Sequence, residues 1–159
     1  MRQASRHFTA LTKVFLAEGG TVDKFIGDSV MVFWNAPHLQ FDHVERACRA
    51  ALSAKAASDV LNNQFEAEGL PAFAVRFGIH SGEAVVGSEE RMNYTVLGNS
   101  VNLAARLEGL NKEYGTTILV SDAVHDRVEH RFRFQPIASV TAKGMTTETR
   151  VYELIEAVA

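Results

Sequence analysis

The sequence predicts an α+β domain in which helices pack on one mixed or largely antiparallel sheet. Segments with helical spacing of apolar residues alternate with short strand-like runs, but not in strict β-α-β order. In addition, two pairs of strand-like runs flank short turns typical of hairpins, at Gly27-Asp28 and Ser81-Gly82. The chain has 159 residues and neither an internal repeat nor a linker, so we expect a single domain over residues 1–159.

The first half of the chain is predicted to form a helix, a hairpin and a second helix. Apolar residues recur at three- and four-residue spacing in residues 4–18, which is typical of a helix. Two β-rich runs within residues 21–34 predict the first hairpin. Asp42 and Glu45 have the spacing of an N-cap and an N3 residue, akin to a capping box, and open an Ala-rich helix that extends to about residue 68.

The second half of the chain is predicted to contain another hairpin, two helices and four more strands. In order, these are the hairpin 72–87, the strand 92–97, a helix over 100–112, the strand 116–120, a short helix capped by Ser121 and ending near residue 128, and the strands 131–137 and 149–156. In the helix over 100–112, an apolar stripe of Leu103, Leu107 and Leu110 is expected to hold the helix to the sheet.

The composition excludes several classes of partner. Apolar residues make up 47% of the chain and charged residues 22%, which is ordinary for a soluble globular protein. The net charge of -3 argues against nucleic acid, and the apolar runs are shorter than the roughly 18 residues that cross a bilayer. The single cysteine, Cys48, excludes an internal disulfide framework and fits a reducing compartment. We therefore expect a cytoplasmic domain with no nucleic-acid or membrane contact.

The first segment with candidate chemistry is residues 20–31. Asp28 lies at the predicted hairpin tip, where its carboxylate can point outward and bind a hard cation such as Mg²⁺ together with substrate phosphates. Lys24 lies four residues earlier and shares a face with Asp28 if the strand is regular. The pair can face a nucleotide, but charged residues beside a hairpin turn are also typical of an ordinary solvated surface.

The second segment is residues 93–108. Asn102 and Arg106 are four residues apart and share a helix face, away from the leucine stripe. Arginine supplies charge and a donor fork to a phosphate ester, and asparagine supplies an orienting hydrogen bond. The alternative is a solvated face on which Arg106 pairs with a nearby acid.

Together these segments resemble consecutive blocks of the class III adenylate and guanylate cyclases. The blocks are residues 19–37, 75–87 and 93–121, and the similarity extends from about Phe8 to Glu153. The resemblance implies the ferredoxin-like cyclase fold. It also implies conversion of ATP to 3′,5′-cyclic AMP by in-line attack of the ribose 3′-hydroxyl on the α-phosphorus, which expels pyrophosphate, in cyclic-nucleotide signal transduction.

The resemblance also implies roles for individual residues. Asp28 matches the second of two aspartates that hold two Mg²⁺ or Mn²⁺ ions. Lys24 matches a residue that reads the base as a donor toward adenine N1, which favours ATP over GTP. Thr95 falls at the second base-reading position, where threonine is similar to the class IIIb branch of adenylate cyclases.

Three further residues match positions that contact the ribose and the phosphates. Asn102 matches the residue that orients the ribose, and Arg106 matches the residue that stabilises charge on the α-phosphate in the transition state. Lys143 lies near the position of a lysine that binds the triphosphate, although Met145 stands where many members have a second lysine. Lys143 is therefore a weaker candidate than the other two.

The resemblance finally implies a homodimer with shared active sites and an upstream regulatory or sensor domain. Lys24 and Asp28 would come from one subunit, and Thr95, Asn102 and Arg106 from the other. The family's domain begins with a strand carrying the first metal aspartate and a first helix, which the sequence from Met1 lacks. We therefore expect this chain alone to have little or no cyclase activity. The alternative function is a non-catalytic nucleotide-binding or dimerisation module derived from a cyclase domain.

Overall fold

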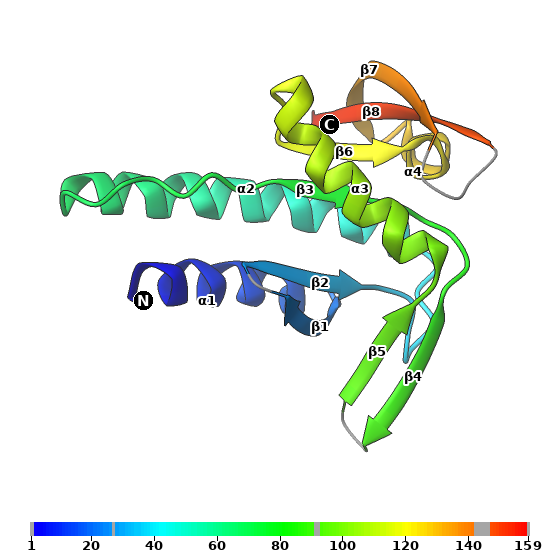
Figure 1. The fold of residues 1–159 in the computed structure, drawn as a ribbon, viewed down its shortest axis with the longest axis horizontal. Coiled ribbons are helices and arrows are strands. Elements are labelled where there is room, and N and C mark those ends of the chain that lie inside the picture. The colour runs from blue at the N-terminus through cyan, green and yellow to red at the C-terminus, as the bar shows by residue number, and fades with distance from the viewer. Residues whose placement is uncertain (1, 27, 91–92, 142–146, 159) are drawn as a thin grey trace.

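The computed structural model describes residues 2–26, 28–90, 93–141 and 147–158. Within these residues the chain forms four helices and eight strands (Figure 1). The helices are α1 (Arg2–Ala17), α2 (His43–Ala67), α3 (Asn99–Tyr114) and α4 (Asp122–Val128). The strands are β1 (Thr21–Ile26), β2 (Ser29–Phe33), β3 (Phe77–Ile79), β4 (Val85–Glu90), β5 (Asn93–Leu97), β6 (Ile118–Ser121), β7 (Phe132–Thr141) and β8 (Glu148–Ala157).

The strands form one mixed sheet and two hairpins. The mixed sheet has the order β3-β6-β8-β7, with β3 parallel to β6 and the other neighbours antiparallel. β1 pairs with β2, and β4 pairs with β5, each antiparallel. In the described part of the chain, β2 and β3 are each edge strands, because β2 pairs with β1 alone and β3 with β6 alone. The predicted α+β class is confirmed.

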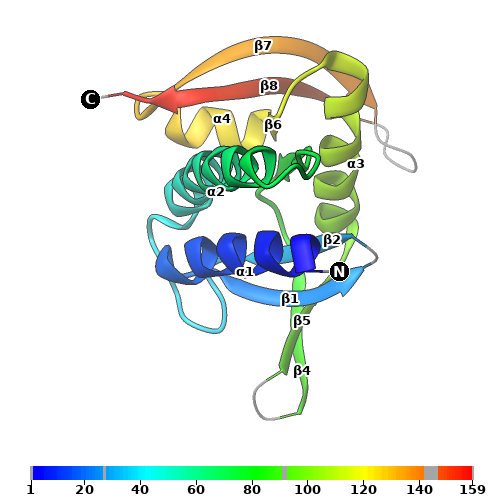
Figure 2. The same cartoon turned by 90° about the vertical axis from the view of Figure 1, so that its left-hand side faces the viewer.

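Helix α2 lies at the centre of the molecule, between the mixed sheet on one side and α1 with the β1–β2 hairpin on the other (Figures 1 and 2). Its alanines allow this close packing on two sides. Toward the sheet and α4, it buries Val44, Cys48 and Ala51; toward α1 and the hairpin, it buries Ala50 and Ala54. Among the described residues, no helix is long and apolar enough to cross a membrane.

Helix α3 covers the opposite face of the mixed sheet. The leucine stripe that the sequence predicts is buried there, with Leu103, Leu107 and Leu110 at most 2% exposed. They pack against Leu119 of β6 and Val151 of β8. Leu119 points away from its neighbours Ile118 and Val120, which face α2, because successive side chains of a strand alternate between the two faces.

The predicted hairpin over residues 72–87 is wrong. Phe77 and Ile79 pack against the core beside α2, whereas Val85 is 69% exposed, so the two halves of the segment have different surroundings. As a result, β3 joins the mixed sheet next to β6, and β4 pairs with the following strand, β5. The β4–β5 hairpin projects away from the rest of the molecule (Figures 1 and 2).

The capping box predicted at Asp42 is also wrong. Asp42 lies at the N-cap of α2, but it makes no side-chain cap among the described residues. Its Oδ1 accepts a hydrogen bond of 2.7 Å from Arg46 Nε, and Glu45 pairs with Arg49. Charge-assisted bonds one helical turn apart have replaced the expected bonds to backbone amides.

Candidate functional site

The β1–β2 hairpin carries the predicted metal ligand. Asp28 is exposed in the turn that follows β1, as the hairpin prediction requires. The hairpin is held to the body by its apolar face, where Val22, Val30 and Val32 pack against Leu11 and Phe15 of α1 and against α2. The hairpin is therefore anchored to α1 and α2, while the carboxylate of Asp28 at its tip faces solvent.

A β-bulge interrupts β1 at the predicted base-reading lysine. Val22 lies opposite Val32 and Phe25 opposite Val30, so two residues of β1, Asp23 and Lys24, oppose the single Met31. A bulge of this kind changes the direction of the side chains on the bulged strand. The bulge therefore interrupts the regular alternation of β1 at Asp23 and Lys24. The structure places Lys24 on β1 by its backbone.

Helix α3 carries the predicted phosphate-facing residues. Asn102 and Arg106 are both exposed, on a face of the helix that lies beside the buried leucines. The helix lies directly on β3 at Gly78, where an added Cβ would come within 2.3 Å of the carbonyl oxygen of Ala104. The Arg–Asn face is thus presented by a helix whose distance from the sheet is fixed by backbone contact.

The start of α3 is tied to the loop after β3. Ser100 Oγ donates a hydrogen bond of 2.7 Å to the carbonyl oxygen of Glu83. On the other side of this loop, His80 Nδ1 lies 2.7 Å from Ser121 Oγ. This bond explains why Ser121 occupies the N-cap position of α4, as predicted, without capping it through its side chain in the described structure. The sequence gives little sign of the contact, because His80 and Ser121 are 41 residues apart.

The elements that carry the predicted residues are neighbours in the fold. β5, which carries Thr95, lies against β1 and against α3. Thr95 pairs with Gly87 of β4 and is placed by its backbone. Lys143 lies outside the described residues. The chain therefore brings together the hairpin β1–β2, the strand β5 and the start of α3.

The carboxylates near the hairpin tip decide how well a metal would fit. Asp28 offers one exposed carboxylate, which suits a hard cation shared with substrate phosphates. Among the described residues, the one group of potential ligands within metal-binding distance of one another is elsewhere, on and just after α4: His125, Asp126 and Glu129. There, Asp126 also pairs with Arg150 at 3.4 Å. Among the described residues, Asp28 thus offers a single candidate ligand and belongs to no group of three or more potential ligands.

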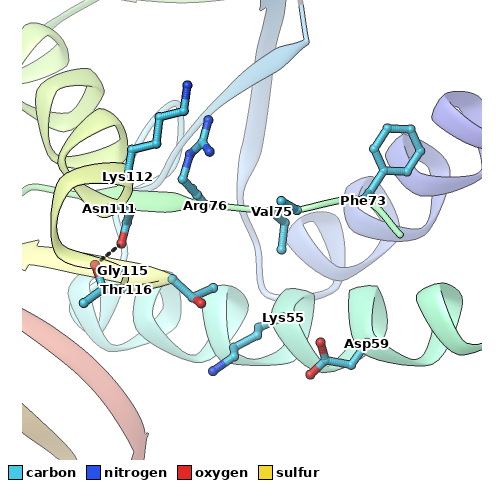
Figure 3. Close-up of a pocket in the computed structure, with 11 residues that line it drawn as sticks. Lys55, Asp59, Phe73, Val75, Arg76, Asn111, Lys112, Gly115 and Thr116 are labelled. Atoms are coloured by element: carbon cyan, nitrogen blue, oxygen red, sulfur yellow. Dashed lines mark hydrogen bonds between the residues drawn. The ribbon is translucent and has the colours of Figure 1, made fainter. Parts of the chain in front are cut away.

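A surface hollow of about 400 Å³ lies at the other end of α3 (Figure 3). It is lined by Lys55 and Asp59 of α2, the segment before β3, and Lys112 and the turn that follows it. Lys112 is ten residues beyond Asn102, a distance of about 15 Å along the helix. The hollow is therefore separate from the predicted site, and none of the predicted residues lines it.

Cys48 is not a candidate nucleophile. Its side chain is fully buried in α2, and burial raises the pKa of the thiol to about 12. The thiolate is the reactive form of cysteine, and it is disfavoured in this environment. Cys48 therefore fills a buried apolar position in the core.

The fold is that of the nucleotide cyclases. Over 98% of its length the chain matches the crystal structure of the adenylyl cyclase CyaB from P. aeruginosa, with a TM-score of 0.85, 28% identity and 81% of that chain covered. It matches the guanylyl cyclase Cya2 equally well, with a TM-score of 0.85, 28% identity and 82% of that chain covered. The chain belongs to the family described as the adenylate and guanylate cyclase catalytic domain, which it matches over residues 4–156.

Curated relatives carry the same domain within longer proteins. Adenylate cyclase 1 of Rhizobium meliloti (strain 1021) is 44% identical over 154 residues, which is 95% of this chain and 23% of that protein. An adenylate cyclase of Anabaena cylindrica is 32% identical over 93% of this chain and 30% of that protein. The chain therefore spans less than a third of the length of these two relatives.

Proposed function

We propose that this chain is the catalytic domain of an adenylate cyclase, which converts ATP to 3′,5′-cyclic AMP and pyrophosphate in cyclic-nucleotide signalling. Membership of the family and the 44% identity to an adenylate cyclase support the reaction class. The structural observation that supports it most is on α3, where Asn102 and Arg106 are exposed one turn apart while the leucines of the neighbouring helix face are buried.

The choice of ATP over GTP rests on the residues at the base. Solved structures of an adenylyl and a guanylyl cyclase resemble the chain equally, so the fold does not distinguish the two nucleotides. Lys24 would donate a hydrogen bond to adenine N1. The N1 atom of the purine ring is an acceptor in adenine, whereas in guanine it carries a proton and is a donor. The Thr95 hydroxyl would accept a bond from the adenine amino group.

The reaction is an in-line displacement at the α-phosphorus. The ribose 3′-oxygen forms a bond to phosphorus and loses its proton, while the bond from the α-phosphorus to the bridging oxygen breaks and pyrophosphate leaves. Asn102 would orient the ribose so that its 3′-oxygen faces the phosphorus. Arg106 would stabilise the negative charge that grows on the α-phosphate oxygens, and its side chain is exposed to solvent.

Divalent cations are part of this proposal, as two Mg²⁺ or Mn²⁺ ions shared between carboxylates and the triphosphate. Asp28 would hold a cation at the hairpin tip. When bound, such ions lower the pKa of the attacking hydroxyl and neutralise the leaving pyrophosphate. In this proposal Asp28 would be one of two aspartates, and full activity would also require the second.

We also propose a homodimer with two shared sites. A two-fold interface would pair Lys24 and Asp28 of one subunit with the Asn102–Arg106 face of the other. The exposure of Asp28, Asn102 and Arg106 supports this arrangement, because each is accessible to a second copy. Monomers are then expected to be inactive.

The test separates an enzyme from a module that only binds nucleotide. We would measure ATP binding and cyclic AMP formation with Mn²⁺, using both the chain and a version extended upstream of Met1. Arg106→Ala should reduce turnover by about 100-fold and weaken ATP binding much less, because the charge it stabilises grows in the transition state. Lys112→Ala, on the same helix, is the control. Equal losses of binding and turnover in Arg106→Ala would contradict the proposed role.

A further inference from the structure

The carboxyl ends of two neighbouring strands meet beside the start of α3. β3 and β6 are parallel, and His80 follows directly after β3 while Ser121 ends β6. His80 Nδ1 and Ser121 Oγ are 2.7 Å apart, and Ser121 is fully buried. One side of the imidazole is therefore fixed to the core sheet.

The other side of the same ring faces the loop that leads to α3. A Cβ added at Gly82 would lie 2.9 Å from His80 Nε2 and 2.5 Å from Ser100 Oγ. The imidazole and the hydroxyl therefore approach the same backbone atom, and a side chain at this position would push them away. Ser100 Oγ also donates to the carbonyl oxygen of Glu83. Contacts thus run without a break from the core sheet to the first turn of α3.

The first turn of α3 needs support of this kind. Its N-cap residue is Gly98, which has no side chain to accept a bond from the free amides. The amides of Val101 and Asn102 bond to the carbonyl oxygen of Gly98, at 3.1 and 3.4 Å. The second of these bonds is long, so the backbone alone holds the turn weakly.

We propose that His80, Gly82 and Ser100 form a clasp that fixes the first turn of α3 and thereby positions Asn102. The clasp itself rests on the contacts above, and its consequence for turnover rests on the proposed function. In this assignment His80 is a positioning residue that acts through Gly82 and Ser100. Asn102 lies two residues beyond Ser100, so a displaced first turn would move the amide that is expected to orient the ribose.

The surroundings of His80 exclude a nucleophilic role for its partner. Ser121 is 0% exposed, so a substrate cannot reach its hydroxyl, and a His–Ser pair for acyl transfer is not formed here. Burial lowers the pKa of His80, and the nearby carboxylate of Asp122 opposes this change. The ring is therefore neutral near pH 7, which suits hydrogen bonding to a hydroxyl.

The first arm of the test is amide hydrogen exchange, which needs no enzymatic activity. His80→Ala and Ser100→Ala should each raise the exchange rates at Val101 and Asn102 by about tenfold and leave those at Leu107 and Leu110 unchanged. His80→Asn keeps a polar atom near the position of Nδ1 and should restore part of the protection. The control is His130→Ala, since His130 is exposed. Unchanged exchange at residues 101 and 102 in both variants, or an equal rise along all of α3, would overturn the clasp.

The second arm is steady-state kinetics with ATP and Mn²⁺ on the version extended upstream of Met1. His80→Ala should lower kcat by about tenfold and change KM less than about threefold, because the binding groups remain while the reacting ribose is misplaced. The double variant with Ser100→Ala should be no worse than the more severe single variant. Faster exchange at residues 101 and 102 with unchanged kcat would overturn the positioning role. Absence of cyclic AMP from the version extended upstream of Met1 would count against the proposed function, while the exchange result would still decide the clasp.

Discussion

The side chain of Asn111 on α3 donates a hydrogen bond of 2.9 Å from Nδ2 to the carbonyl oxygen of Phe77 on β3. Its Oδ1 accepts a bond of 2.7 Å from Thr116 Oγ1, in the turn after the helix. Asn111 is 1% exposed, so these polar groups are shielded from water. The amide joins the helix that carries the proposed phosphate-facing residues to the edge strand of the mixed sheet.

Replacing Asn111 by alanine should therefore destabilise the fold. The change removes one hydrogen bond from the carbonyl oxygen of Phe77 and one from the hydroxyl of Thr116, which costs roughly 2–3 kcal/mol of unfolding free energy. Urea denaturation measures this loss. Asn63→Ala, at an exposed position of α2, should change the free energy by less than about 0.5 kcal/mol. Equal stabilities of the two variants would show that the Asn111 bonds contribute little.

Gly78 allows α3 to lie directly on β3. A Cβ at this position would come within 2.3 Å of two backbone atoms, the oxygen of Ala104 and the nitrogen of Glu108, and backbone cannot rotate away as a side chain can. Gly78→Ala should cost more than about 2 kcal/mol of unfolding free energy. Gly109→Ala is the matched control, because the described structure places no atom within 4 Å of its added Cβ. That helical substitution should stabilise by about 0.5–1 kcal/mol. A neutral Gly78→Ala would contradict the close contact.

Local patterns in the sequence predict most of the helices and the buried face of α3. Leu103, Leu107 and Leu110 repeat at helical spacing, and the same three side chains are buried on the sheet. The tip position of Asp28 also follows from local signals, because a Gly-Asp turn between two β-rich runs specifies a hairpin. The exposed Asn102–Arg106 pair is predicted by the same helical spacing.

Pairings between distant segments are harder to predict from local sequence patterns. The segment 72–87 has the local pattern of a hairpin. However, β3 packs Phe77 and Ile79 against the core by pairing with β6, and this depends on tertiary packing that the local pattern does not contain. The bulge at Asp23–Lys24 depends on how β1 fits β2. The His80–Ser121 contact requires the parallel β3–β6 pairing to be known first.

The buried His7 on α1 should make stability depend on pH. Its Nε2 lies 2.9 Å from Ser58 Oγ on α2, and its ring centroid lies 5.0 Å from that of Phe73. Burial lowers the pKa of His7, so the unfolded chain binds the proton more readily. The contribution of His7 to the free energy of unfolding is then fully present above the ordinary histidine pKa of about 6.5. It is lost as the pH falls toward the lowered pKa of His7 in the folded state.

Urea denaturation at about pH 7.5 and about pH 5.5 measures this effect. The unmodified chain should be less stable at the lower pH, and His7→Gln should reduce the difference. His80 contributes with the same sign, because burial lowers its pKa as well, so part of the difference should remain. His130→Gln, at an exposed position, should leave the difference as it is. A difference that His7→Gln does not reduce would contradict the role of the buried ring.

Lys24 is expected to set the choice of base. Lys24→Glu replaces the donor toward adenine N1 by an acceptor that suits the N1–H of guanine, and it should raise the ratio of cyclic GMP to cyclic AMP by about tenfold. Both products are measured from ATP and GTP at equal concentration. Lys13→Glu makes the same charge change at an exposed position of α1 and should leave the ratio unchanged. The same shift in both variants would indicate a general effect of charge and not base reading.

The central claim is that this domain makes cyclic AMP. The direct measurement is the rate at which the version extended upstream of Met1 forms cyclic AMP from ATP and cyclic GMP from GTP, each with Mn²⁺. We expect cyclic AMP to form at least about ten times faster than cyclic GMP. If the extended version binds ATP but forms neither cyclic nucleotide, the domain is a nucleotide-binding module and the proposed activity is wrong.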